Sequence, residues 1–254
     1  MTISQFRKRI WDHYAAHGRH DMAWRKKRDP YRIVVSEVML QQTQVARVEK
    51  KYPEFIAAFP GFASLAKAPL KDVLAAWQGM GYNRRALMMH KLAKRVMAEY
   101  GGKLPRDLKL LNELPGVGRG TAGALCAFAF NKPAVFIETN IRRVFIHYFF
   151  PKKARVTDAE IFPFIEQTLD VKNPRAWYYA LMDYGAMLGK TSVRDNPNRR
   201  SVHYAKQPSF PGSRRQLRGK IIKLLLRRQS LTVSACVREL AEPEKYIRNV
   251  LASL

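Results

Sequence analysis

One carboxylate stands in an otherwise apolar and basic run, VFIETNIRRVF, at residues 135–145. If this run is helical, Glu138 lies one turn before Arg142, and the two side chains can form an ordinary surface ion pair. The alternative is a buried carboxylate that is held in place for chemistry. A second acid, Glu37, has the apolar neighbours Val34, Val38 and Met39. Burial among them would raise its pKa and keep it protonated near neutral pH.

Composition sets the class of partner before any motif is considered. The chain has 254 residues, of which 47% are hydrophobic, enough to bury one large core or two smaller ones. Its formal net charge of +26 makes nucleic acid the expected partner. The sequence has no long apolar run and no apolar signal region, so a membrane partner is not expected. Cys126 and Cys236 fit buried thiols in a reducing compartment. We therefore expect a cytoplasmic monomer that acts at the chromosome.

Helical periodicity dominates the chain and strand-like alternation is almost absent, which predicts an all-α fold. The expected helices of the first hundred residues are 4–18, 33–51, 53–58, 62–66, 70–77 and 84–100. Residues 190–212 are basic and lack periodicity, as in a linker or strap. A basic amphipathic helix then follows at 214–229, and two short helices, at 232–240 and 244–254, close the chain. These last three helices fit either a helix-turn-helix DNA reader or a plain three-helix cap.

The most specific local motif is LNELPGVGRGTAGAL at residues 111–125. A helix is expected to end near Glu113 and another to begin at Arg119, with Gly116 and Gly118 permitting the tight turn between them. The backbone amides of this turn and of the helix N-terminus would then point outward and form an anion site. The turn residues concerned are Gly116, Val117, Gly118, Arg119 and Gly120. Such a hairpin can hold one DNA phosphate without reading sequence.

Four blocks resemble one family when they are taken in order. They are SEVMLQQTQV (36–45), GMGYNRRA (79–86), LPGVGRGTAGA (114–124) and the acid-x-Asn-x-x-Arg-Val run at 138–144. Together they resemble the adenine DNA glycosylase (MutY) family of the helix-hairpin-helix DNA glycosylase superfamily. The resemblance implies a two-domain helical fold: a six-helix domain at 28–135, and a second helical domain made of 1–27 and 136–200. Residues 201–254 would add the strap and the small C-terminal helical module.

The resemblance also implies a reaction, which is cleavage of the N-glycosidic bond of a base swung out of the duplex. Glu138 occupies the place of the family's catalytic aspartate, where it would stabilise a cationic sugar, as paired carboxylates do in sugar hydrolases. Asn140 belongs to the same motif. Glu37 matches the general acid that protonates the leaving base. The family pattern Asp-Gly-Asn is here Glu138-Thr139-Asn140, and the longer carboxylate puts the preservation of activity in question.

The implied substrate is double-stranded DNA that contains a mismatch or lesion, with adenine opposite 8-oxoguanine or guanine removed in base excision repair. Two alternatives stay open: a mismatch thymine/uracil DNA glycosylase, and a non-catalytic DNA-binding paralogue. Gly120 stands where endonuclease III carries the lysine that forms a Schiff base with the sugar and cuts the strand. The expected enzyme is therefore monofunctional and without lyase activity.

Further DNA contacts follow from the same blocks. Gln41, Gln42 and Tyr82 match residues that the family inserts into the duplex. Trp24 and Arg25 resemble the wall of the base pocket, although Trp24 fits a core anchor equally well. On the C-terminal basic helix, Arg214 and Arg215 are expected to contact DNA phosphates.

Most relatives hold an iron–sulfur cluster with four cysteines directly after the glycosylase domain. The corresponding positions in this chain are Gly189, Asn196, Arg199 and Ala205. None of these side chains is an iron ligand of that kind, so no cluster and no other cofactor is expected. The carbonyls of Leu114 and Val117 in the hairpin offer a position for a monovalent cation, and no other metal site is expected.

Overall fold

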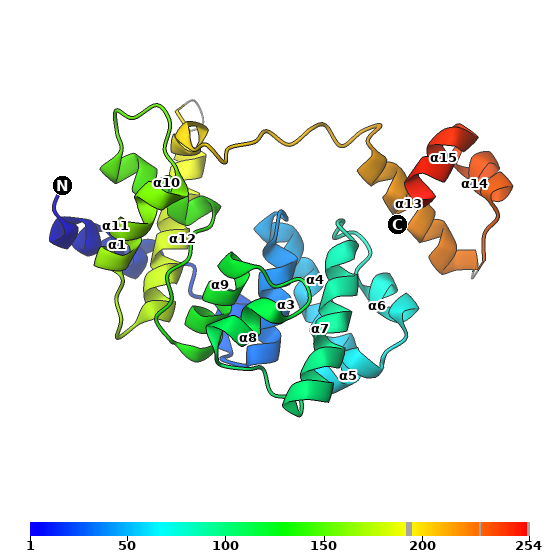
Figure 1. Cartoon of the computed structure of the whole chain (residues 1–254), viewed down its shortest axis with the longest axis horizontal. Coiled ribbons are helices and arrows are strands. Elements are labelled where there is room, and N and C mark those ends of the chain that lie inside the picture. The colour runs from blue at the N-terminus through cyan, green and yellow to red at the C-terminus, as the bar shows by residue number, and fades with distance from the viewer. Residues whose placement is uncertain (192–194, 229, 253–254) are drawn as a thin grey trace. The chain divides into compact units, whose positions relative to one another are not determined.

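The structure, a computed structural model, describes residues 1–191, 195–228 and 230–252. Over these ranges it contains helices and no β-strand, so the predicted all-α class is confirmed (Figure 1). Residues 192–194 of the expected strap, and the last residues of two expected C-terminal helices (229 and 253–254), lie outside the described ranges. No helix in the described part of the chain is long and apolar enough to cross a bilayer.

The chain divides into two compact units by its internal contacts. Unit 1 comprises residues 1–37 and 104–205, and unit 2 comprises residues 38–103 and 206–254. Helix α3 (Pro30–Leu40) crosses the boundary between them. The three domain ranges expected from the sequence stay predictions.

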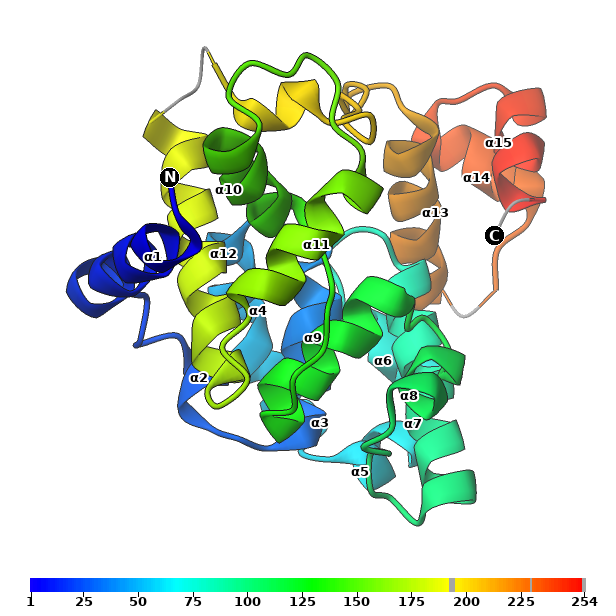
Figure 2. The same cartoon turned by 60° about the vertical axis from the view of Figure 1, so that its left-hand side comes forward.

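Unit 1 is built around two helices that pack along each other, α10 (Thr139–Phe149) and α12 (Pro174–Thr191), which lie side by side in both views (Figures 1 and 2). The remaining helices of the unit are α1 (Ile3–His17), α2 (Ala23–Lys26), α8 (Leu108–Glu113), α9 (Arg119–Phe130), α11 (Asp158–Thr168) and the 3-10 helix η1 (Pro197–Arg200). Phe6 of α1 inserts between Phe145 and Trp177, with ring centroids 5.3 and 6.1 Å away. Burial of such large aromatic side chains supplies much of the unit's stability.

The start of α10 packs closely against α12. A side chain on Gly185 would overlap the backbone of Asn140, so only glycine fits at this point. The guanidinium of Arg143 lies in a similar way against Gly189. Two glycines one helical turn apart therefore let α12 pack directly under the first turn of α10, which carries the motif acid.

Unit 2 contains α4 (Val45–Ala58), α5 (Phe62–Lys67), α6 (Leu70–Ala76) and α7 (Arg84–Tyr100). The expectation of one helix over 33–51 is wrong, because the chain leaves α3 after Leu40 and begins α4 at Val45. Gln42 lies in the break with a φ of 52°, in the left-handed region that few non-glycine residues adopt. The predicted helix at 53–58 is the last part of α4, which continues through Pro53.

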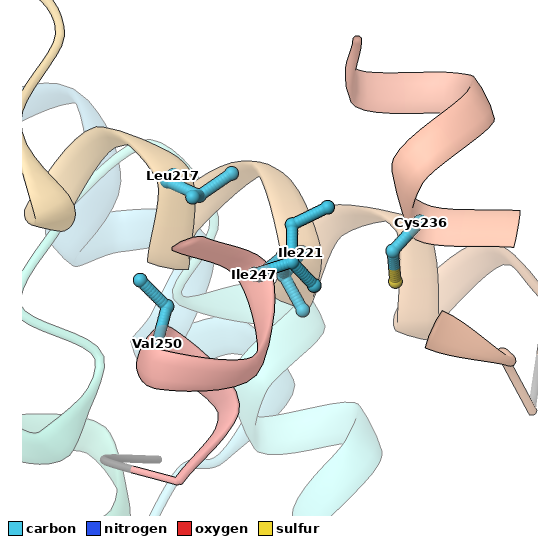
Figure 3. Packing of buried hydrophobic residues seen from close by; sticks show 5 residues of the cluster. All are labelled: Leu217, Ile221, Cys236, Ile247 and Val250. Atoms are coloured by element: carbon cyan, nitrogen blue, oxygen red, sulfur yellow. The ribbon is translucent and has the colours of Figure 1, made fainter. Parts of the chain in front are cut away.

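The C-terminal part of unit 2 is a three-helix module formed by α13 (Arg214–Arg228), α14 (Val233–Leu240) and α15 (Glu244–Leu251). Its core consists of Leu217, Ile221, Cys236, Ile247 and Val250, which Figure 3 shows between the three helices. Cys236 is a free, buried thiol, as is Cys126 in unit 1.

Candidate active site and nucleic-acid contacts

Glu138 is the N-cap of α10, and its side chain turns back onto the helix that follows. Oε1 accepts hydrogen bonds from the backbone amides of Asn140 and Ile141, at 2.7 and 2.9 Å. Amides at a helix N-terminus carry partial positive charge, so they favour the ionised carboxylate. Burial raises the pKa of Glu138, and these two amides together with the charges of Arg143 and Arg142 oppose that rise. The carboxylate is thus fixed in place and partly compensated.

The alternative of a surface pair between Glu138 and Arg142 does not match the structure. Arg142 directs its guanidinium to Asp158, with two hydrogen bonds of 2.7 Å from Nε and Nη2. This fork-to-fork geometry is the strong form of an arginine–carboxylate pair. The hydrogen bonds to Glu138 come from Asn140 and Ile141 instead. The surface-pair alternative is therefore wrong, and the catalytic role of Glu138 stays a prediction.

Glu37 lies on α3 between side chains that are almost completely buried, Ser36 and Val38. Burial raises its pKa to about 8, the negative charge of Glu138 adds to the rise, and Arg25 opposes it. The direction expected from its apolar neighbours is the direction found. Because the charge of Glu138 raises the pKa of Glu37, the two acids are electrostatically coupled. Glu138 is the member with backbone donors and so ionises first, whereas Glu37 stays protonated at neutral pH.

Asn140 connects the acid to the helix beneath it. Its Nδ2 lies 3.4 Å from Oε2 of Glu138, and its Oδ1 accepts a hydrogen bond of 2.8 Å from Arg143. Arg143 also donates to the carbonyl of Gly185. Asn140 is therefore held in one orientation, with its amide toward the carboxylate. Arg143 was not among the residues expected from the sequence, because one more arginine in a strongly basic chain gives no signal.

The two residues expected at the wall of the base pocket have different environments. Trp24 is 3% exposed, which agrees with the core-anchor alternative. Arg25 donates to both carboxylate oxygens of Asp183, at 2.7 and 2.8 Å, and its guanidinium lies 4.2 Å from the ring centroid of Tyr179. Asp183 is a functional candidate that the sequence interpretation missed. Its signal was available, since it is a lone acid in the apolar helix that contains WYYALMDYGAM.

The hairpin has the predicted geometry. Gly116 has a φ of 79°, the amide of Val117 donates to the carbonyl of Leu114 at 3.0 Å, and Gly118 is the N-cap of α9. The side chains of Leu114 and Val117 are buried, whereas Gly118, Arg119 and Gly120 are exposed. The first amides of α9 thus face outward with no acceptor within the helix, as an anion site requires. One lone pair of the Leu114 carbonyl is used by Val117, and the cation position stays a prediction.

In unit 2, Arg85 contacts two turns. One turn contains Gln41 and Gln42, and the other contains Tyr82. Tyr82 has a φ of 47° and its hydroxyl accepts hydrogen bonds from Arg215, at 2.9 Å, and from Gln207. The guanidinium of Arg215 also lies 5.9 Å from the centre of the Tyr82 ring. The two expected DNA-binding arginines therefore differ. Arg214 is exposed and donates to the carbonyl of Asn249, whereas Arg215 is partly enclosed at Tyr82.

At the four positions where the family resemblance implies cluster ligands, this chain has Gly189, Asn196, Arg199 and Ala205. Gly189 has no donor, and Ala205 carries only a methyl group. Asn196 uses its Oδ1 to cap η1 and to accept from Arg143, at 3.2 Å. Arg199, the remaining position, is cationic. Within the described residues no three His, Cys, Asp or Glu side chains gather in a metal-binding group. Hydrogen bonds now connect this segment to α10, including one of 2.9 Å from Asn198 to the carbonyl of Thr139.

Comparisons with known proteins agree with these features. Residues 35–163 match the family described as "HhH-GPD superfamily base excision DNA repair protein". The chain is 34% identical over 198 residues to an adenine DNA glycosylase of Buchnera aphidicola subsp. Baizongia pistaciae, a match that covers 78% of this chain and 56% of the relative. It is 36% identical over 132 residues to a thymine/uracil-DNA glycosylase of Methanothermobacter thermautotrophicus, covering 52% and 60%.

Among solved structures, a thermostable thymine-DNA glycosylase superposes with a TM-score of 0.65 at 29% identity. That match covers 73% of this chain and 86% of the other. The chain spans a little over half the length of the curated adenine-specific relatives from Buchnera.

Proposed function

Because the chain belongs to the HhH-GPD superfamily of base excision DNA repair proteins, we propose that it is a monofunctional DNA glycosylase acting on a flipped-out base in double-stranded DNA. Adenine opposite 8-oxoguanine or guanine is the substrate we favour, because relatives named adenine DNA glycosylase match 78%, 74% and 74% of this chain at 31–34% identity. Mismatched thymine or uracil is the second candidate, favoured by the similarity to a thymine/uracil-DNA glycosylase.

The observation that carries the proposal is the pair of carboxyl groups with opposed environments. Glu37, with a pKa of about 8, can give a proton to the leaving base at neutral pH. Glu138, ionised and held by two amides, can stabilise the positive charge that develops on the sugar as the bond breaks. After base release Glu37 is a carboxylate and can accept a proton from the water that attacks the sugar. The pair thus provides both halves of a hydrolysis.

Two further features support the DNA substrate. The hairpin offers outward-facing amides to one phosphate, and the net charge of +26 favours binding of the polyanion. Gly120 presents no amine that could attack the sugar, which is why we propose hydrolysis without strand cleavage. We also propose that it acts without a cofactor, because Gly189, Asn196, Arg199 and Ala205 stand where the resemblance implies cluster ligands.

The experiment is a single-turnover assay on duplex oligonucleotides. Each duplex carries adenine, thymine, uracil or hypoxanthine opposite guanine or 8-oxoguanine. We expect release of adenine in preference to the other bases, with strands that stay intact until alkali cleaves the abasic site. Preferred release of thymine or uracil opposite guanine would support the second candidate. If no base is released from any duplex while binding stays tight, the chain is a DNA-binding paralogue and the proposed activity is wrong.

A further inference from the structure

Arg85, in the first turn of α7, contacts two turns of unit 2 that lie about forty residues apart in the sequence. Its Nη1 donates to three carbonyls of one turn, those of Val38, Met39 and Gln41, at 2.8, 2.9 and 2.6 Å. Its Nη2 donates to the hydroxyl of Thr43, at 3.0 Å, and thus completes the same turn. A single planar side chain therefore fixes the chain between α3 and α4.

The same nitrogen, Nη2, also reaches the second turn. It donates to the carbonyls of Met80 and Gly81, at 3.2 and 3.3 Å. The guanidinium carbon lies 5.4 Å from the ring centroid of Tyr82 and 5.3 Å from that of Trp77. Gln42 in the first turn and Tyr82 in the second both have positive φ. Such backbone conformations persist only when surrounding contacts over-determine them.

Charge and helix geometry explain why an arginine is needed here. Val38 and Met39 are in the last turn of α3, where carbonyls have no partner within the helix and partial negative charge accumulates. Burial lowers the pKa of Arg85 to about 10, so the group still carries its charge at neutral pH. A lysine would keep the charge but has three donors and no planar fork, so it cannot serve six acceptors on two turns.

We propose that Arg85 is a positioning residue that holds the Gln41–Gln42 turn and the Tyr82 turn together as one rigid wedge, which opens the duplex and keeps the target base extruded. The inference rests on the proposed function, because the wedge acts on the DNA that the glycosylase would cleave. Without Arg85, each turn could change its backbone conformation when it is inserted between stacked bases. The hydrogen bonds of Arg85 to both turns keep them in a fixed relative position.

The test compares Arg85→Lys with the wild type on two substrates. In one duplex the target adenine faces 8-oxoguanine, and in the other it faces an abasic-site analogue, so that no pairing opposes extrusion. We expect Arg85→Lys to slow single-turnover release from the paired duplex by about 100-fold, the cost of displacing an active group by about 1 Å. Release from the unpaired duplex should slow by less than about 10-fold. An equal loss on both substrates would overturn the proposal.

A second readout does not depend on base release. With 2-aminopurine at the target position, fluorescence reports unstacking of the base. The wild type should raise it, and Arg85→Lys should raise it much less at saturating protein. If the wild type releases no base but unstacks 2-aminopurine through Arg85, the proposed function fails and the wedge stands. If both proteins give the same fluorescence, the wedge is wrong whether or not a base is released.

Two further variants separate positioning from loss of folding. Arg84→Lys changes the neighbouring, exposed arginine in the same way and should match the wild type in both assays. Thr43→Val removes one acceptor of Arg85 with little change in shape, and we expect a smaller defect with the same preference for the paired duplex. Thermal unfolding of each variant checks that it is folded at the assay temperature. A Thr43→Val defect without that preference would also contradict the proposal.

Discussion

Glu138 has a structural role as the N-cap of α10 beside the chemical role proposed for it. Its carboxylate caps α10 through the amides of Asn140 and Ile141, which fixes the side chain without a cationic partner in direct contact. The single-turnover assay tests whether the longer side chain keeps the activity. A glutamate is one methylene longer than aspartate, and here the extra length is used in turning back onto the helix. Sequence patterns identify the residue as an acid in the motif, but they do not reveal this turn.

The pKa values of the acid pair predict the pH dependence of the reaction. Glu37 must be protonated to donate its proton, so kcat/KM should fall above about pH 8. Replacement by glutamine in Glu37→Gln should lower the rate by about 100- to 10,000-fold and remove this alkaline limb. Single-turnover rates between pH 5 and 10 measure both effects. An alkaline limb that persists in Glu37→Gln would assign it to another group.

The same shift predicts a pH dependence of stability. The folded-state pKa of Glu37 is raised from 4.5 to about 8, so the folded protein binds more protons than the unfolded chain in that range. The stability that Glu37 contributes is fully present below pH 4.5 and is lost as the pH rises toward about 8. Urea unfolding of the wild type and Glu37→Gln should therefore diverge progressively across this window, with the wild type losing stability faster. Parallel curves would contradict the assigned burial.

At the scale of elements, the sequence predicts which segments are helical better than it predicts where they end. The apolar pattern continues from α3 into α4, which is why one helix over 33–51 was expected. The break at Gln41–Gln42 depends on Arg85, more than forty residues away, and local periodicity contains no such information. The hairpin could be predicted, because the positive φ of Gly116 is a local requirement of the turn, whereas Gly118 has a φ of −91° that any residue can adopt. Polar contacts over long separations, such as Arg19 and Arg25 with Asp183, could not.

The C-terminal helix α13 gives a prediction that distinguishes two neighbouring arginines. Arg214 is exposed and Arg215 is bound to Tyr82. Either alanine variant should weaken DNA binding equally for all sequences and reduce the slope of log K against log salt by about 0.9. At saturating protein, Arg215→Ala should release base more slowly than Arg214→Ala, because only Arg215 supports Tyr82. Salt titrations of affinity and single-turnover rates measure the two effects.

Equal saturating rates for the two variants would show that the contact between Arg215 and Tyr82 has no part in the reaction. An unchanged salt slope in both would remove α13 from the DNA-binding surface altogether. The module would then be the plain three-helix cap, which the sequence left open as an alternative to a DNA reader.

At the scale of the whole molecule, charge and composition predicted the class of partner, and the motifs predicted the family. Buried acids explain part of the charge balance. Asp183 and Asp158 are each paired with arginines, and Glu37, with a pKa of about 8, is mostly uncharged at neutral pH. The segment after α12 was predicted only as lacking cysteine ligands. Its contacts with α10, of Asn196 with Arg143 and of Asn198 with Thr139, required the structure.

The central claim is that the carboxylate of Glu138 stabilises a cationic sugar, and Glu138→Gln tests it most directly. The amide oxygen of glutamine can accept the same two backbone hydrogen bonds, so the cap and the fold should be kept while the negative charge is removed. We predict that base release in a single turnover falls by at least about 100-fold, with the dissociation constant for the same duplex changed only a few-fold. Release at the wild-type rate by Glu138→Gln would contradict the account.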